Sequence, residues 1–229
     1  METGGSDRFH ERTAASVALI EDLCEQGARA AGVDGAGVSV IATARSAQPV
    51  LSTDARSARI EEIQFTLGEG PCYDAATTRC PVLVSDLTDD TDPSVTRWPA
   101  FLDEALAAGV RAVFAFPLGV GAVTVGSLDL YRRTPGPLSA EQLNASLVTA
   151  DSVGKALLAE DPLDRHLEQS TWLRMTVHQA AGMVMVQTGG TIEDALLLLR
   201  SSAYGEGRSV NDLAADVLEG RRRYEKEER

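Results

Sequence analysis

The sequence of 229 residues has few of the side chains that build catalytic or metal centres. It holds only three histidines, His10, His166 and His178, and none lies between residues 11 and 165. This gap excludes a histidine-based metal, haem or acid–base centre from the central part of the chain. The sequence also contains no nucleophile elbow, P-loop, dinucleotide fingerprint or zinc-ligand spacing. We therefore expect a protein that is not an enzyme and that needs neither a cofactor nor a metal.

Cysteines are equally few. Cys24, Cys72 and Cys80 are odd in number and lack CxxC spacing, so no disulfide framework is expected and a reducing cytoplasm fits. Cys72 and Cys80 flank a short predicted helix, where they could sense redox changes or a thiol ligand, although burial in a packed core is the commoner role of a cysteine.

Long apolar stretches are also missing. No run approaches the ~20 residues that a membrane-spanning helix needs. The polar residues 1–12 lack the apolar centre of a signal peptide. We expect a cytoplasmic protein without membrane contact.

Basic residues are outnumbered by acidic ones, 21 to 34, which gives a net charge of -13. The imbalance is uneven: from Arg165 onward nine basic residues face ten acidic ones, whereas the preceding 164 residues hold the other 12 and 24. Contacts with phosphate supply much of the affinity of proteins for nucleic acids. A nucleic-acid surface is therefore expected only in the C-terminal part, and only locally.

Helical and strand patterns alternate over residues 13–160, which predicts an α+β domain built on a sheet. The near-continuous apolar runs 110–120 and 122–132 predict central strands. Ser139, with Gln142 three residues later, forms a capping box at the start of a long helix. The remaining predicted elements are helices over 13–31 and 99–109, a turn leading into a helix over 67–78, and strands over 37–43, 48–53 and 81–87.

No strand pattern follows Pro162, and three helices are predicted instead. The first spans about residues 163–187, and its apolar stripe includes Val177, Ala181 and Val184. Glycine stops and polar caps predict the other boundaries: Gly189 and Gly190 end the first helix, Thr191 with Asp194 caps the second, Gly205 ends it, and Ser209 with Asp212 caps the third.

Small residues cluster in these helices, at Ala180–Gly182 and at Ala214 and Ala215. Such clusters permit close helix packing, because small side chains let neighbouring backbones approach. Gly182 has a second interpretation, in which it lets the backbone of another molecule approach an exposed face.

Three segments of the C-terminal part carry a family resemblance: QAAGMVM (179–185), EDALLLLRSSAY (193–204) and LAADVL (213–218). With them, residues 174–218 resemble an ANTAR domain, the three-helix RNA-binding module of bacterial antiterminators. We assign this domain to residues 163–224. Many members have a basic residue where this chain has Ala181, so one phosphate contact expected of the family is missing.

Residues 13–160 resemble a GAF domain, the sheet domain of many bacterial sensors. The segments that carry this likeness are LGEGPCYDA (67–75), PVLVSDL (81–87), RWPAFLDEALAAGVRAVFAFPL (97–118) and GSLDLYR (126–132). The pairing with ANTAR is typical of actinobacterial regulators. The resemblance implies cytoplasmic homodimers that bind paired RNA stem-loops in nascent transcripts, prevent terminator formation, and respond to a signal, such as a small-molecule ligand, at the GAF domain. The ligand-binding residues stay unassigned.

Arginine and aromatic side chains read RNA loops by contacting phosphates and stacking on bases. Arg174, His178 and Gly182 are spaced four residues apart and share one helical face. Two alternatives stay open, that Tyr204 belongs to the core and that Arg200 is merely solvated. The run Arg221–Arg223 is either a phosphate contact or a frayed, solvated tail. The full set of predicted RNA-binding residues is Arg174, His178, Gln179, Gly182, Arg200, Tyr204 and Arg208.

We expect the helices over 13–31 and 139–160 to form the dimer seam, as terminal helices of GAF domains often do. Three other functions compete with RNA binding. The helical module could bind a protein partner instead of RNA, and a GAF domain that senses a small molecule would control this binding. The sheet domain could be a methionine-sulfoxide reductase, or the module could be a DNA-binding helix-turn-helix. A steep salt dependence would separate nucleic acid from a protein partner.

Overall fold

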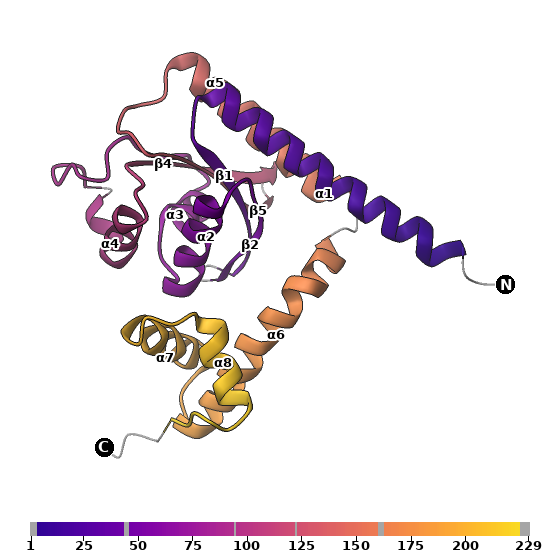
Figure 1. Cartoon of the computed structure of the whole chain (residues 1–229), viewed down its shortest axis with the longest axis vertical. Helices are drawn as coiled ribbons and strands as arrows, with labels where there is room; N and C mark the ends of the chain where they lie inside the picture. Colours follow the sequence, from indigo (N-terminus) through magenta and orange to yellow (C-terminus); the bar gives the residue numbers. More distant parts are fainter. Residues whose placement is uncertain (1–3, 44–45, 94, 122, 160–162, 225–229) are drawn as a thin grey trace. The chain divides into compact units, whose positions relative to one another are not determined.

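Five antiparallel strands form one sheet in the order β2-β1-β5-β4-β3 (Figure 1). The prediction that the two long apolar runs are central strands is confirmed, because β5 lies in the middle of the sheet with β4 beside it. The strands predicted over 37–43 and 48–53 are β1 and β2, which are paired antiparallel and adjacent in the chain. The strand bounds are β1 (Gly35–Thr43), β2 (Ser46–Ser52), β3 (Val82–Val84), β4 (Ala112–Val120) and β5 (Val123–Arg132).

The computed structural model describes residues 4–43, 46–93, 95–121, 123–159 and 163–224. The chain divides into two compact units, Met1–Leu163 and Asp164–Arg229. We call the first the sheet domain and the second the helical unit. The α+β class with a helical C-terminal region is the class that the sequence predicts.

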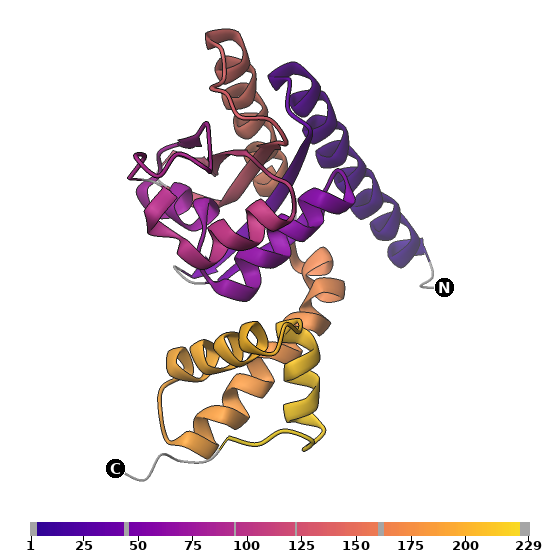
Figure 2. The same ribbon diagram turned by 60° about the vertical axis from the view of Figure 1, so that its left-hand side comes forward.

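Helices cover both faces of the sheet. Phe114 and Phe116 point from β4 to the face covered by α1 and α5, whereas Val113 and Ala115 point to the face covered by α2, α3 and α4. α1 and α5 lie side by side in both views (Figures 1 and 2). The helices of the sheet domain are α1 (Gly4–Ala31), α2 (Ala55–Leu67), α3 (Pro71–Thr78), α4 (Pro99–Ala107) and α5 (Ala140–Ala159), with a 3-10 turn, η1, at Val95–Arg97.

α2 is not predicted from the sequence. Its N-terminus is well capped, since Asp54 accepts the backbone N–H groups of Arg56 and Ser57. The buried face of the helix, however, includes the polar residues Glu61 and Gln64. A helical pattern that relies on apolar residues is interrupted at these two positions, and the helix is therefore hidden from a search for hydrophobic periodicity.

The predicted capping box of α5 is present. The backbone N–H of Ser139 donates to Gln142 Oε1 over 2.9 Å, and the N–H of Gln142 donates to Ser139 Oγ over 3.2 Å. The apolar side chains of α5 are only partly buried. Val153 lies in the core, but Leu147 and Leu158 are exposed, since α5 contacts the sheet and α1 with a narrower face than its apolar residues cover.

The helical unit consists of α6 (Leu163–Thr188), α7 (Ile192–Gly205) and α8 (Val210–Leu218). Thr191 and Asp194 form the predicted reciprocal cap of α7, and Ser209 caps α8 through the N–H of Asp212. Gly205 is the last residue of α7 rather than its stop, since the left-handed turn comes at Gly207, with φ of 61°. The core of the unit is lined by Val177, Ala180, Ala181, Val184, Ala195, Leu199, Ala203, Val210, Leu213, Ala214 and Val217.

Candidate functional sites

Two carboxyl groups face each other inside the sheet domain, Glu61 on α2 and Asp129 on β5. Both side chains are buried and hydrogen-bond to one another. Ser39 donates to Glu61, whereas Ser127 donates to Asp129 Oδ1 over 2.6 Å and the Gln64 amide donates to Asp129 Oδ2. The pair is thus held by polar partners from β1, β5 and α2.

Burial raises the pKa of both carboxyl groups. The pKa of Asp129 rises to about 6, because loss of solvent outweighs its three hydrogen bonds. The pKa of Glu61 lies well above its usual range through burial first and the charge of Asp129 second. Two neighbouring buried carboxyl groups cannot both ionise at low cost, so the pair retains a proton near neutral pH.

A surface cleft of about 450 Å³ lies beside α3 in the sheet domain. At this cleft the guanidinium of Arg97 pairs with the carboxylate of Asp74 over 2.9 Å and stacks on the indole of Trp98, 4.8 Å from the ring centre. Glu69 is engaged elsewhere, since it accepts the N–H groups of Ala100 and Phe101 at the start of α4. The cleft is lined by Gly68, Glu69, Gly70, Tyr73, Asp74, Thr77, Thr78, Arg97 and Trp98.

The cysteines differ in their surroundings. Cys72 is fully buried, and its pKa is raised first by burial and then by the charges of Asp129 and Glu61. Its thiol form is therefore favoured over the nucleophilic thiolate. Cys80 is exposed, so a packing role is wrong for it.

In the helical unit, two of the predicted residues of α6 are exposed to solvent. His178 and Gln179 are exposed, whereas Ala180 and Ala181, which follow them, are fully buried. A Cβ atom added at Gly182 would meet nothing within 4 Å, so packing among the described residues does not require a glycine there. Arg174 belongs to α6, but its side chain lies outside the described residues.

The two predicted residues of α7, Arg200 and Tyr204, differ in their exposure, and for both the alternative to RNA binding is contradicted. Tyr204 is 45% exposed, so its assignment to the core is wrong. Arg200 is only 8% exposed, so the interpretation as a solvated side chain is also wrong. Arg200 lies close to His178: partial burial, followed by the charge of this arginine, lowers the pKa of the histidine. His178 is consequently neutral at pH 7.

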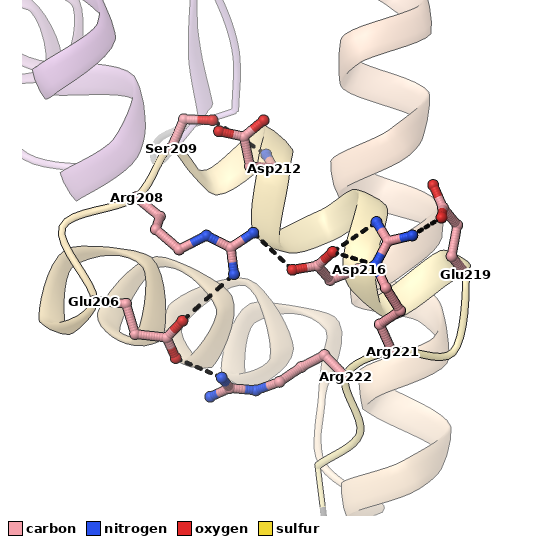
Figure 3. Close-up of polar contacts among 8 residues, drawn as sticks. All are labelled: Glu206, Arg208, Ser209, Asp212, Asp216, Glu219, Arg221 and Arg222. Atoms are coloured by element: carbon pink, nitrogen blue, oxygen red, sulfur yellow. Dashed lines mark hydrogen bonds and ion pairs between the residues drawn. The ribbon is translucent and has the colours of Figure 1, made fainter.

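Arg208 belongs to a network of ion pairs at the ends of α7 and α8 (Figure 3). Its guanidinium contacts Asp216 over 2.6 Å and Glu206 over 3.6 Å, and Glu206 also pairs with Arg222. Two hydrogen-bonding arginines, Arg208 and then Arg221, lower the pKa of Asp216. The charge of Arg208, one of the predicted RNA-binding residues, is thus already balanced by carboxylates of the same chain.

The C-terminal basic run takes part in the same network. Arg221 pairs with Asp216 over 2.7 Å and with Glu219, and the guanidinium of Arg222 stacks 5.1 Å from the ring centre of Tyr224. The expectation of a frayed, solvated tail is therefore wrong for Arg221 and Arg222. Cations and carboxylates alternate here, so the network offers no uncompensated positive patch.

Sequence reasoning assigned no residue of the sheet domain to a site. One signal was available for the buried pair: Asp129 stands directly between two leucines, Leu128 and Leu130, in a central strand. A carboxylate at such a position is rarely buried without a specific partner. The cleft left no comparable signal, because its residues come from two separate stretches of the chain, 68–78 and 97–98.

The sequence profile of the GAF domain matches residues 17–157, which is more than half of the chain. The chain belongs to the GAF domain family. The profile does not reach the helical unit, so the ANTAR resemblance stays a prediction. No curated protein sequence matches the chain significantly.

Solved GAF domains resemble the sheet domain at low sequence identity. The GAF-B domain of DevS from Mycobacterium smegmatis is 19% identical, covering 69% of this chain and 98% of its own, with a TM-score of 0.44. GAF3 of Slr1393 from Synechocystis sp. PCC6803 is 18% identical, covering 65% and 96%, with a TM-score of 0.47. The GAF domain of a phosphoenolpyruvate-protein phosphotransferase from Coxiella burnetii is 11% identical, covering 67% and 90%, with a TM-score of 0.48. Among the described residues of our GAF protein, no helix has the length and apolarity needed to cross a membrane.

Proposed function

We propose that this protein is a non-enzymatic, signal-responsive regulator that binds RNA stem-loops through its helical unit, under the control of its GAF domain, and thereby acts in transcription antitermination. The observation that carries the proposal is the exposure of His178, Gln179 and Tyr204 at positions within the ANTAR-like segments. Each of these side chains has a ring or an amide that can stack on, or hydrogen-bond to, an unpaired base.

The chemistry of α6 and α7 suits bases better than phosphates. His178 is uncharged near neutral pH, and Tyr204 presents a phenol ring to solvent. Arg208 is engaged with Asp216 and Glu206. Recognition would therefore depend on stacking in an unpaired loop, with a modest electrostatic contribution.

A single RNA-binding site of this kind has low affinity, and a homodimer that presents two such sites would bind more tightly. Exposed apolar side chains lie on α1 (Leu19) and on α5 (Leu147, Val148 and Leu158). These helices favour the seam of a homodimer, because burial of apolar surface drives association. Two helical units tethered in this way would bind paired stem-loops with a high effective concentration.

A specific observation also favours a protein partner for the helical unit. Three apolar side chains of α6 and α7 are exposed: Met183, Val186 and Leu197. The region from Arg165 onward has a net charge of -1, which does not attract a polyanion over a broad surface. The two candidates differ in their response to salt.

The test uses the full chain and a fluorescent RNA that carries two hairpins, with anisotropy measured across a range of salt concentrations. Tyr204→Ala should weaken binding about tenfold, the loss expected for one stacked base. Tyr204→Phe is the matched control: it keeps the ring and should bind like the wild type. If the wild type does not bind the RNA even at low salt, the proposal is contradicted. Tyr204→Ala binding the RNA as tightly as the wild type would contradict a stacking role for Tyr204, and a wild type that binds no RNA at any salt concentration would favour the protein-partner alternative.

A further inference from the structure

The cleft of the sheet domain presents a positive and a negative side chain next to one another, which favours a small molecule that carries both charges. Its volume of about 450 Å³ lies in the range of small-molecule sites. Asp74 and Arg97 lie at its wall, 2.9 Å apart, and keep 29% and 47% of their side chains exposed. Such an exposed ion pair contributes little to stability, so a ligand can separate it at low cost.

The guanidinium of Arg97 is held ready for a ligand. It lies over the ring of Trp98, and that indole is fixed in turn by the core, where it makes an edge-to-face contact with Phe101 at 6.3 Å. Stacking orients the guanidinium plane but uses none of its N–H groups. Within the described parts of the chain, Asp74 is the one acceptor found for these donors, and a single nitrogen reaches it. Arg97 can therefore offer donors to a second carboxylate.

The two charges together exclude simple ions. A simple anion on Arg97 would bring a second negative charge beside Asp74, and a simple cation on Asp74 would bring a second positive charge beside Arg97, so neither ion is matched by both side chains. A zwitterion whose ammonium and carboxylate groups are adjacent satisfies both at once. In an α-amino acid these groups are joined through one carbon, which places nitrogen and oxygen about 3 Å apart, similar to the separation of the ion pair that they would replace.

We propose that this cleft binds a free α-amino acid, with Arg97 holding its carboxylate and Asp74 its ammonium group. The ligand's side chain would lie along α3, where Thr77 is exposed to the cleft. Binding is reversible and non-covalent, and it would supply the signal of the proposed regulator. Because every lining residue belongs to the GAF domain, it can be measured without RNA.

The experiment titrates the full chain calorimetrically with each of the twenty standard amino acids at millimolar concentration. At least one should bind the wild type, and Arg97→Gln and Asp74→Asn should each weaken that binding at least tenfold. Arg59→Gln is the matched control. It breaks an exposed ion pair of the same length, 2.9 Å to Glu104, outside the cleft, and should leave binding unchanged.

Two derivatives of the same amino acid test the two contacts separately. The N-acetyl derivative has lost its ammonium charge and the amide derivative its carboxylate, so both should bind at least tenfold more weakly than the parent. Thermal melts without ligand establish that the variants are folded. The proposal is overturned if none of the twenty amino acids binds, if Arg97→Gln binds as well as the wild type, or if the acetylated ligand binds as well as the free one. None of these outcomes depends on whether the helical unit binds RNA.

Discussion

Glu61 on α2 and Asp129 on β5 form a buried carboxyl pair that hydrogen-bonds across the interface between helix and sheet. Gly37 on β1 makes room for this pair, since a Cβ atom there would lie 2.4 Å from Glu61 Oε1. Buried carboxyl groups in contact are stable only when at least one of them is protonated. The folding of the sheet domain is therefore coupled to the uptake of protons.

The first prediction is that the stability of the protein falls as pH rises through the acidic range. The pKa of both groups is raised on folding, so the folded state binds more protons than the unfolded state above the unfolded pKa values near 4. The free energy of unfolding then decreases from about pH 4 through about pH 6, the pKa of Asp129, and the raised pKa of Glu61 adds to this decrease. Urea unfolding at a series of pH values measures this slope.

The variant Glu61→Gln should flatten that slope. Glutamine keeps the shape of Glu61, can accept from Ser39 and can donate to Asp129, but it carries no proton that is lost on raising the pH. The variant should gain stability relative to the wild type at pH 8 and lose that advantage at pH 5. Equal slopes for the two proteins would show that the pair does not titrate as proposed.

The second prediction compares two glycines inside helices. A Cβ atom at Gly154 on α5 would lie 2.9 Å from the backbone nitrogen of Gly119 on β4, whereas at Gly182 on α6 it would meet nothing. Gly154→Ala should therefore destabilise the protein by about 1–3 kcal/mol through overpacking. Gly182→Ala should stabilise the helix by roughly 0.5–1 kcal/mol.

Chemical denaturation measures both effects, and the hairpin RNA adds a second readout. If Gly182 serves the approach of a partner backbone, Gly182→Ala should weaken RNA binding although it stabilises the fold. Unchanged binding would reduce Gly182 to a residue without an interface role. A stabilising Gly154→Ala would contradict the close approach of α5 to β4.

Much of the fold is predictable because local signals agree with it. The Ser139–Gln142 and Thr191–Asp194 caps are short-range hydrogen bonds that any helix start can form, and both are present. The central strands β4 and β5 follow from their apolar runs. α2 was not predictable in this way, because the side chain of Glu61 is buried through hydrogen bonds with Ser39 on β1 and Asp129 on β5, which are distant in the sequence.

The site residues were less predictable than the fold, and for a related reason. Helical spacing places Arg200 and Tyr204 one turn apart, but spacing does not say which of the two faces solvent. Burial of Arg200 and exposure of Tyr204 depend on the crossing of α6 and α7, which is a tertiary property. Likewise, Arg208 looks like a free cation in the sequence, and only the fold brings Asp216 to it.

The third prediction concerns the ion-pair network of Figure 3. Asp216 joins Arg208 and Arg221, whereas Glu219 pairs with Arg221. Asp216→Asn should lower the melting temperature more than Glu219→Gln does, and the difference should shrink at high salt, which screens exposed charges. The same variant removes one of the two carboxylates that pair with each of Arg208 and Arg221, so it should bind hairpin RNA more tightly at low salt. A melting temperature equal to that of Glu219→Gln would show that the two pairs of Asp216 do not act together.

The fourth prediction tests the dimer seam through Val148, which exposes 58% of its surface on α5. A charge placed at an apolar seam must be desolvated on association, so Val148→Glu should shift the protein from dimer to monomer. Leu83→Glu on β3 is the matched control, since Leu83 is a comparable exposed apolar residue at 43% that belongs to an edge strand of the sheet rather than to α1 or α5. Light scattering measures the mass of each protein at micromolar concentration. A wild type that is already monomeric, or a Val148→Glu variant that stays dimeric, would exclude this seam.

If the seam is correct, the monomeric variant should also lose affinity for paired hairpins while still binding a single one, because only the tethering of two sites is removed.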